Sequence, residues 1–387
     1  MKNEFELNPE VEYLNTGTLS LVPKSIMKAH VQELYDYEKN PTANLFAGWG
    51  RLWDVQKKVA PFLGAKPEDF FFRHNVTGAM NDFILGVKLP AGDIATTDLE
   101  YGAITNICRF RCQKENRKLI TVAIPNENTI ESEDALIDSI LSQLPSSVKL
   151  LMLSHVMTGA GLRIPIEKLG KKLKERGIIF AVDGAHGAGA FKVDFSKFEG
   201  IQFYGGNLHK WMLGPKGTGF GWVPAGFQDQ LEVIQAGWTT FETPPPFVPF
   251  GNGNRFASKM LMSNCLSFPT FFVLKDLIEW WEIQGVDKIH AQLQHLRKNL
   301  EAVATENKWS IVSPKLDSLK SPLLALEVKP EYAAKPLDTL NSVLNKTGLQ
   351  ITMSPWRGSF VLRLSAHVYA DESRFVSAFE KLDYLRK

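Results

Sequence analysis

Between residues 60 and 225, apolar runs of strand length alternate with segments of helical periodicity, and this alternation constrains the fold more than any other feature of the chain. Strands are expected at 70–72, 93–97, 119–124, 149–154, 178–182, 200–204 and 219–223. Helices between them are expected at 77–87, 103–116, 132–144 and 166–176. Because the strands are apolar along nearly their whole length, they indicate an α/β fold in which helices cover both faces of a parallel sheet.

The pattern changes in the C-terminal third of the chain. A proline-rich stretch at 243–249 and a stretch of glycine and asparagine at 251–254 predict loops. Beyond them, helices are expected at 268–283, 286–307 and 371–385, and strands at 323–328 and 358–364. We therefore expect a large domain at 21–255 and a smaller α+β C-terminal domain at 256–387, with residues 1–20 packing against the smaller one.

Composition and charge exclude several classes of protein. The net charge of +2 gives no electrostatic basis for binding nucleic acid, and no apolar run approaches the roughly 20 residues of a membrane span. The acidic N-terminus lacks the apolar core of a signal peptide. The three cysteines, Cys108, Cys112 and Cys265, lack metal-ligand spacing. We expect a cytoplasmic protein with no metal site, no membrane contact and no nucleic-acid partner.

Polar residues follow the expected strands, at the edge of a parallel sheet where ligands gather. Asn75-Val76-Thr77-Gly78 opens a helix, and its free N–H groups together with the Thr77 hydroxyl predict a phosphate cradle. The alternative is that Thr77 only caps the helix. Tyr101 is expected either to lie against a planar cofactor or to be an ordinary half-buried loop residue. Thr158 is expected to donate to a substituent of such a ring.

Asp183 ends the apolar run Ile178-Ile-Phe-Ala-Val182 and is followed by Gly-Ala-His186. A buried carboxylate needs a partner. A protonated pyridine nitrogen is such a partner, and keeping it protonated makes the ring an electron sink. His186 is expected to hydrogen-bond the same cofactor. In the alternative interpretation, Asp183 caps the next helix and His186 fills the turn.

Lys210 has the most specific surroundings of the candidate residues. It stands between His209 and Trp211, and the glycine-rich turn Gly214-Pro-Lys-Gly-Thr-Gly219 follows. Desolvation lowers the pKa of an amine and makes it nucleophilic toward carbonyl groups, so Lys210 is expected to form a Schiff base with an aldehyde cofactor. The alternative, a lysine on a surface loop, explains neither the neighbouring His209 nor the turn.

A second glycine-rich stretch, Gly184-Ala-His-Gly-Ala-Gly189, suggests a dinucleotide site. Its spacing is not G-x-G-x-x-G, and no first βα unit of the right form surrounds it. A nucleotide-dependent α/β enzyme is therefore a distant alternative. A binding or scaffold protein that has kept the fold without the chemistry is a third.

Taken together, these residues resemble the class-V aminotransferase family, enzymes of fold type I that use pyridoxal 5′-phosphate. The resemblance runs from Tyr13-Leu-Asn15-Thr-Gly17 to Leu362-Arg363-Leu-Ser365-Ala-His-Val-Tyr369. It is closest to isopenicillin N epimerase-like proteins, on Glu100-Tyr101, Asp183-Gly-Ala-His186 and Asn207-Leu-His209-Lys210. The resemblance implies a large domain with a mostly parallel seven-stranded sheet, a smaller α+β C-terminal domain, and a homodimer with its sites at the subunit interface.

The resemblance also implies a role for each matching position. Lys210 would carry the internal aldimine, Asp183 would pair with the pyridine nitrogen, and Tyr101 would stack on the ring. His186 and Thr158 would lie near the phenolic oxygen of the cofactor. The phosphate would be held by Val76, Thr77, Asn207 and His209. Arg363 would grip the substrate carboxylate as a bidentate fork, and Asn15 would line the substrate end.

The chain departs from the family pattern at two places. Met262-Ser263-Asn264-Cys265 stands where a Gly-Thr pair often reaches the phosphate of the neighbouring subunit. No cysteine follows Cys265, so the mobile-loop cysteine of cysteine desulfurases is missing. The expected substrate is an amino acid that reacts at Cα, by epimerisation or transamination, or alternatively by C–S or other β-elimination. For epimerisation, Tyr101 is the one acid that we can name opposite Lys210.

Overall fold

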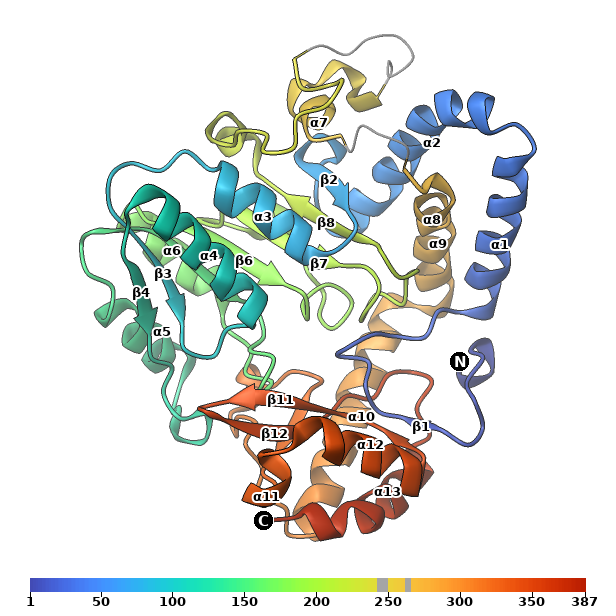
Figure 1. Ribbon diagram of the computed structural model, residues 1–387, viewed down its shortest axis with the longest axis vertical. Helices are drawn as coiled ribbons and strands as arrows, with labels where there is room; N and C mark the ends of the chain where they lie inside the picture. The colour runs from blue at the N-terminus through green and yellow to red at the C-terminus, as the bar shows by residue number, and fades with distance from the viewer. Residues whose placement is uncertain (242–249, 262–265) are drawn as a thin grey trace.

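The computed structural model describes residues 1–241, 250–261 and 266–387. The loop expected at 243–249 and the segment 262–265 lie outside the described residues. The seven expected strands form one sheet, in the order β2-β8-β7-β6-β5-β3-β4 (Figure 1). Their bounds are Phe70–Arg73 (β2), Asp93–Thr97 (β3), Leu119–Val122 (β4), Val148–Ser154 (β5), Ile179–Gly184 (β6), Phe203–Asn207 (β7) and Gly219–Trp222 (β8).

The pairing of these strands confirms the mostly parallel α/β sheet. Strands β4, β3, β5, β6 and β7 run parallel to one another, whereas β8 pairs antiparallel with both β7 and β2. Strand β7 begins at Phe203 rather than at Gly200, because Gly200 has a positive φ of 74° that ends the preceding turn. The carboxyl ends of β5, β6 and β7 therefore lie side by side.

Helices cover both faces of the sheet, as expected. Helices α3 (Val76–Gly86) and α4 (Gly102–Glu115) pack with one face, in front of the sheet in Figure 1. Helices α5 (Glu133–Ser142) and α6 (Ile166–Glu175) pack with the other face. Local signals set their ends: Asn75 accepts from the N–H of Gly78 at the start of α3, and Ser132 caps α5 in the same way.

Two long helices near the N-terminus were not predicted, α1 (Lys24–Glu38) and α2 (Pro41–Phe62). Helix α2 carries the start signals that would have revealed it, since Asn40 caps it and Pro41 occupies its first position. Helix α1 gives a weaker signal because Ile26 is its one fully buried residue. Its apolar side chains Met27, Val31, Leu34 and Tyr35 are exposed in the single chain.

The single helix expected at 268–283 is wrong, because the segment forms two helices. Helix α8 (Phe268–Phe272) packs on α1 and α2, whereas α9 (Leu274–Gln284) packs on α2 and on the next helix, α10 (Val286–Glu306). The chain turns at Val273 between them. Within α8, Phe268 stacks on Phe272 and meets Trp49 of α2 edge-on. Both halves carry apolar residues at helical spacing, so the apolar content of the segment alone does not indicate the break.

The C-terminal part is built around a three-stranded antiparallel sheet in the order β11-β12-β9, with bounds Thr352–Trp356, Ser359–Leu364 and Leu324–Leu326. Helices α11 (Pro330–Ala333), α12 (Pro336–Thr347) and α13 (Phe375–Leu382) accompany it, and it has a hydrophobic core of its own. The helix expected at 371–385 is shorter, with a 3₁₀ turn at each end.

The N-terminal segment lies against this C-terminal part. Strand β1 (Glu12–Tyr13) pairs in parallel with β10 (Leu349–Gln350), and Asn15 forms a bridge with Ser365. This places residues 15–18 beside β12, near the carboxyl ends of the large sheet. The domain limits at residues 20 and 255 stay a prediction. A search of the described residues finds no helix with the length and apolarity that a membrane crossing requires.

Candidate active site

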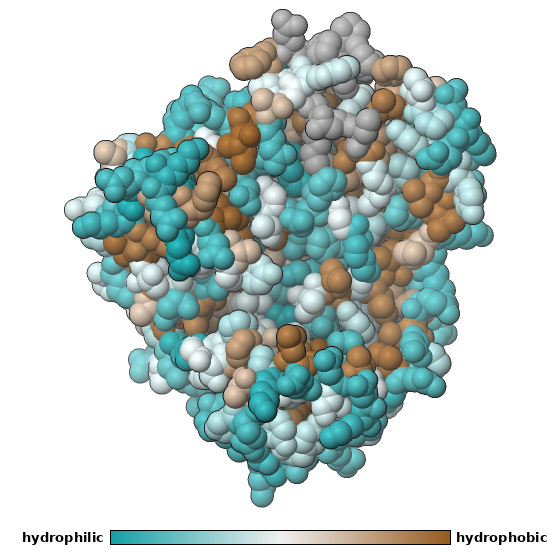
Figure 2. Space-filling model, viewed as in Figure 1, coloured by the Kyte–Doolittle hydropathy of each residue, from teal (hydrophilic) through white to brown (hydrophobic). Residues whose placement is uncertain are grey.

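A cavity of about 710 Å³ lies where the carboxyl ends of β5, β6 and β7 face the C-terminal part of the chain. Figure 2 shows this face of the molecule hollowed between the upper part and the lower, C-terminal part. The wall on the side of the large sheet comes from strand ends and from the first residues of α3 and α4. The opposite wall comes from β11, from Arg363 of β12 and from Gly17 and Thr18.

Ten of the eleven residues expected at the site line this one cavity: Val76, Thr77, Tyr101, Thr158, Asp183, His186, Asn207, His209, Lys210 and Arg363. Asn15 does not belong to the lining that the structure describes. Its carboxamide oxygen instead accepts from the Thr18 hydroxyl at 2.8 Å, and Thr18 lines the cavity. Asn15 therefore reaches the site through Thr18.

Lys210 lies on a tight turn that follows β7. The N–H of Leu213 donates to the carbonyl of Lys210 at 3.0 Å, and that of Gly214 to the carbonyl of Leu208 at 2.7 Å. Burial, together with the positive charge of Arg363, lowers the pKa of the Lys210 amine to about 8, although Asp183 opposes the shift. About a tenth of the amine is therefore deprotonated at pH 7, far more than for an ordinary lysine, and the neutral form is the one that attacks a carbonyl group.

Asp183 lies at the end of β6, buried among the strand ends. One carboxylate oxygen accepts from the N–H of Ala185 at 2.8 Å. Burial raises the pKa of Asp183, which that hydrogen bond and the charge of Lys210 partly counteract. A carboxylate in such a place is stabilised by a further donor, above all a positively charged one.

The start of α3 and the end of β7 form one corner of the cavity. The Asn207 side-chain oxygen accepts from the N–H of Val76 at 2.8 Å, so this N–H is not free for a phosphate. The Thr77 backbone and hydroxyl remain at the N-terminus of the helix. His209 lies beside them with a buried Nδ1 that has no hydrogen-bond partner within residues 1–241, 250–261 and 266–387. Burial lowers the pKa of His209 to about 4, so the ring is neutral at physiological pH.

Arg363 is the buried cation of the opposite wall. Its two terminal nitrogens donate to the hydroxyl oxygens of Thr158 at 2.6 Å and Thr18 at 3.0 Å, while its Nε is buried without a partner in the part of the chain that the structure describes. Burial lowers the pKa of the guanidinium to about 10, which leaves it charged at neutral pH. The unused donor makes Arg363 ready to accept an anionic group.

His186 connects the two walls. Its Nδ1 accepts from the indole N–H of Trp211 at 3.1 Å, and its Nε2 is 3.4 Å from the hydroxyl oxygen of Thr158. Burial, with the positive charges of Lys210 and Arg363, holds the pKa of His186 well below its ordinary value. The ring is therefore neutral in the cavity.

Glu100 was not expected among the site residues, although it stands next to Tyr101. Its carboxylate accepts from the Ser154 N–H at 2.9 Å, the Ser154 hydroxyl at 2.5 Å and the Thr97 hydroxyl at 3.1 Å. Burial raises the pKa of Glu100 to about 7, and the negative charge of Asp183 adds to the shift. An acidic residue three positions after the strand expected at 93–97 was the signal for it. The residues 352–355 of β11 were missed as well.

Comparison with known proteins places these features in a family. The model of the family described as aminotransferase class V matches residues 12–373. The chain belongs to the aminotransferase class-V family. The expectation of a pyridoxal-phosphate-dependent enzyme of this family is thereby confirmed, whereas the individual residue roles stay predictions.

Relatives of the chain carry out different reactions. Isopenicillin N epimerase from Streptomyces clavuligerus is 25% identical, over 98% of this chain and 96% of its own length. A probable cysteine desulfurase from Pyrococcus abyssi is 28% identical over 62% of this chain and 60% of its own. A hercynylcysteine sulfoxide lyase from Schizosaccharomyces pombe is 21% identical over 97% of this chain and 94% of its own.

Solved structures confirm the fold-type-I architecture. A mutant of the protein C-DES, with glycine covalently linked to its pyridoxal phosphate cofactor, matches with a TM-score of 0.86 and 17% identity over 100% of this chain and 99% of its own. The apo cysteine desulfurase from Thermococcus onnurineus matches with a TM-score of 0.81 and 21% identity over 98% and 96% of the two chains.

The residues of the cavity fit pyridoxal phosphate as a bound group. Asp183 is a buried carboxylate that a pyridinium nitrogen would neutralise, and Lys210 is a desolvated amine for the aldehyde. The N-terminus of α3 provides donors for a phosphate, and Nδ1 of His209 has no hydrogen-bond partner among the described residues. These groups lie in one cavity of sufficient volume, so the donor set matches the chemistry of the cofactor.

Proposed function

We propose that this protein is a pyridoxal-phosphate-dependent enzyme that acts at the Cα of an amino acid, in the manner of isopenicillin N epimerase-like proteins. Its reaction is epimerisation or transamination. The single observation that supports it most is that Lys210, Asp183 and Arg363 line one buried cavity. The chemistry of a nucleotide-dependent enzyme does not require a desolvated lysine together with a buried carboxylate and a buried guanidinium.

Pyridoxal phosphate, when bound, supplies an aldehyde for the amine and a ring that withdraws electrons from the Cα of the substrate. Lys210 would hold the cofactor through its aldehyde, and the amine of Lys210, when free, would take the Cα proton of the substrate. A pKa of about 8 suits both tasks, because the amine is partly neutral as a nucleophile and is still basic enough to hold a proton.

Asp183 keeps the ring nitrogen protonated, so that negative charge developing at Cα is drawn away from it. Arg363 binds the substrate carboxylate and thereby fixes which bond at Cα faces Lys210. Thr18 and Thr158 hold the guanidinium in place from two sides. The proton is thus removed by Lys210 on one face of the substrate.

The fate of that proton separates the possible reactions. Return of a proton to the opposite face of Cα gives epimerisation, and this needs an acid on the side away from Lys210. Tyr101 lines the cavity and has 53% of its side chain exposed in the single chain. We propose that Tyr101 stacks on the ring and supplies this acid in the epimerase reaction.

A second candidate is a β-elimination lyase that breaks a C–S bond. It is favoured by the hercynylcysteine sulfoxide lyase, which matches 97% of this chain. The persulfide chemistry of a cysteine desulfurase is disfavoured. Cys108 and Cys112 are buried on α4 and neither lines the cavity, and the chain has no cysteine beyond 265.

The experiment that tests the proposal has two parts. The purified protein should show a visible absorption band with pyridoxal phosphate, and the band and all activity should be lost in Lys210→Ala. Incubation with a panel of amino acids in D₂O, followed by mass spectrometry and chiral chromatography, should then show deuterium at Cα. Full activity and intact colour in Lys210→Ala would contradict the proposal.

The products of that incubation identify the reaction. Inverted configuration means epimerisation, a keto acid without loss of a substituent means transamination, and release of a β-substituent supports the lyase. An enzyme that exchanges no Cα proton with any amino acid and forms no product would refute action at Cα. Sulfur release from cysteine with formation of a protein persulfide would show that the desulfurase was wrongly disfavoured.

We also propose that the enzyme is a homodimer. Helix α1 exposes Met27, Val31, Leu34 and Tyr35 at intervals that place them on one face, and a row of this kind is typical of a subunit interface. A double variant, Val31→Glu with Leu34→Glu, should convert a dimer to a monomer in sedimentation velocity. A wild-type monomer at micromolar concentration would contradict the proposal.

A further inference from the structure

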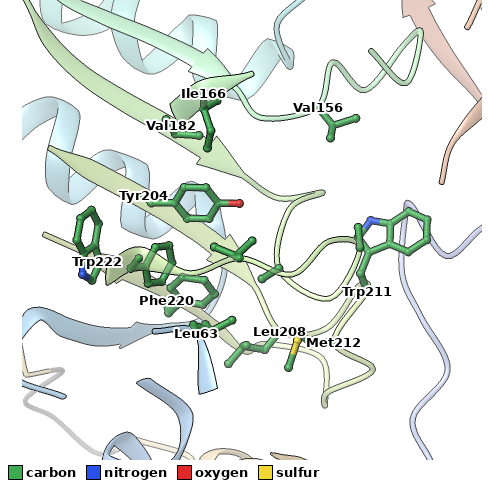
Figure 3. Close-up of a cluster of buried hydrophobic side chains, with 14 of the residues drawn as sticks. Leu63, Val156, Ile166, Val182, Tyr204, Leu208, Trp211, Met212, Phe220 and Trp222 are labelled. Atoms are coloured by element: carbon green, nitrogen blue, oxygen red, sulfur yellow. The ribbon is translucent and has the colours of Figure 1, made fainter. Parts of the chain in front are cut away.

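The residue after the lysine, Trp211, is fully buried and is not explained by the chemistry above. Its indole N–H donates to Nδ1 of His186 at 3.1 Å. Its carbonyl oxygen is 3.0 Å from Nε2 of His367, and its ring stacks on that histidine. In Figure 3 the Trp211 side chain stands at the end of the hydrophobic cluster, away from the aromatic group of Tyr204, Phe220 and Trp222. Its position is therefore fixed from several sides.

The Trp211 hydrogen bond has a consequence for the protons of His186. An indole N–H can only donate, so the nitrogen that it meets must offer a lone pair. Nδ1 of His186 therefore carries no proton. Because the ring is neutral, its one N–H proton must be on Nε2. Nε2 is the nitrogen near Thr158, and both residues line the cavity.

We propose that Trp211 is a positioning residue that locks His186 in the Nε2–H tautomer, so that the cavity meets a hydrogen-bond donor at this point. An unrestrained neutral imidazole could present either a donor or a lone pair here. The indole removes that choice without adding a charge to a cavity that already holds Lys210 and Arg363. Trp211 acts through His186 and does not line the cavity itself.

The lock determines what this end of the cavity binds. Thr158 accepts from Arg363 at 2.6 Å, which leaves its own hydroxyl hydrogen free to donate. His186, Thr158 and Arg363 thus present donors from one side. This set is suited to an anionic oxygen, such as the phenolate of pyridoxal phosphate. The identity of that oxygen rests on the proposed function, whereas the tautomer does not.

The tautomer can be measured directly in the wild-type protein. The chain has eight histidines, few enough for ¹⁵N-histidine labelling to give a readable two-bond ¹H–¹⁵N spectrum. The signals of His186 are those that disappear in His186→Gln. We expect the Nε2–H pattern, both in the protein saturated with pyridoxal phosphate and in the protein without it. An Nδ1–H pattern or an imidazolium pattern would overturn the proposal.

Trp211→Phe removes the N–H and keeps an aromatic ring, and Trp281→Phe is its matched control. Trp281 is also fully buried and also donates to this turn, but to the carbonyl of Met212 at 2.8 Å. We expect His186 in Trp211→Phe to show a mixture of tautomers or Nδ1–H, and in Trp281→Phe to keep the wild-type pattern. Affinity for pyridoxal phosphate should fall roughly threefold to tenfold in Trp211→Phe alone, the effect of one ordinary hydrogen bond.

The outcomes separate this proposal from the proposed function. A pure Nε2–H pattern that persists in Trp211→Phe would refute the lock, even if the enzyme is fully active. Failure of the wild type to bind pyridoxal phosphate would refute the function and leave the tautomer measurable. If Trp211→Phe does not fold, the N–N coupling across the Trp211–His186 hydrogen bond in the doubly ¹⁵N-labelled wild type decides. Its presence supports the lock and its absence contradicts it.

Discussion

The two walls of the cavity are built on different principles. The wall of the large sheet consists of residues at or shortly after strand ends, such as Asp183 near the end of β6 and Lys210 on the turn after β7. The opposite wall joins Gly17 and Thr18 to β11 and β12, segments more than 300 residues apart in the sequence. In the proposed function, the first wall holds the cofactor and the guanidinium of the second wall binds the substrate. The comparison suggests that cofactor chemistry and substrate binding can be changed separately.

The largest effect in this comparison should come from Asp183, the expected partner of the pyridine nitrogen, which lies on the wall of the large sheet. Asp183→Asn removes the negative charge that keeps a pyridine nitrogen protonated, so turnover should fall about a hundredfold or more. The KM for the amino acid should change little, because Arg363 is untouched. Steady-state kinetics and Cα-deuterium exchange measure this. Wild-type turnover would exclude Asp183 from the role.

The next largest effect should come from Arg363, on the opposite wall. Arg363→Lys loses the bidentate fork and should weaken substrate binding by about 1.5–3 kcal/mol, the scale of a charged hydrogen bond. Absorbance of bound cofactor should be unchanged. Arg297→Lys is a control, since Arg297 is another buried arginine, which donates to Leu323 and Glu301. A loss of cofactor in Arg363→Lys would show that the two walls are not independent.

A smaller effect on the same wall should come from Thr18. Thr18→Val keeps the shape of the side chain but removes the oxygen that holds one end of Arg363. The KM should rise about threefold with little change in kcat, as expected for one indirect hydrogen bond. Thr16→Val is the matched control, because the Thr16 hydroxyl pairs with Tyr369 rather than with Arg363. An equal rise of KM in both variants would show that the effect comes from a disturbed N-terminal segment and not from the Thr18–Arg363 hydrogen bond.

The last effect is on stability rather than on activity, and it concerns Glu100. Its pKa is raised to about 7 in the folded state, so between its ordinary pKa of 4.5 and about 7 the folded state keeps a proton that the unfolded state has lost. Wild-type stability should therefore fall as pH rises through this window, and Glu100→Gln should lack that fall. The difference is about 3 kcal/mol.

In a chain of this length, a difference of that size shifts the melting temperature by only a few degrees. Melting curves of the wild type and of Glu100→Gln at pH 5, 6, 7 and 8 measure it. The melting temperature of Glu100→Gln should rise relative to that of the wild type from pH 5 to pH 7, and the difference should then stay constant. Parallel curves at every pH would show that Glu100 is ionised throughout.

Sequence reasoning succeeded where one local pattern determines the position of a side chain. Asp183 and Lys210 follow strands that are apolar enough to be recognised, and the parallel sheet then brings their ends together. Thr18 was missed because nothing near it in the sequence indicates that β1 pairs with β10 and places it beside Arg363. Asn15 was expected to line the substrate end of the cavity. In the structure it contacts Thr18, and Thr18 lines the cavity.

The helices also differ in whether local sequence or distant contacts determine their ends. Asn75 and Ser132 mark their helices by local capping, whereas the break at Val273 depends on which helix each half of the segment meets. The turn that holds Lys210 was recognised from its glycines. The hydrogen bond from Trp211 to His186 was not, because it joins residues of two loops through a contact that no sequence pattern records.

The C-terminal core has a further consequence. Arg363 belongs to a strand packed in that core, whereas Lys210 belongs to the body of the large sheet. The distance between the Lys210 amine and the Arg363 guanidinium is therefore set by how the C-terminal part packs against the large sheet. Substitutions far from the cavity, along the contact between these two parts, would alter which lengths of amino acid the enzyme admits.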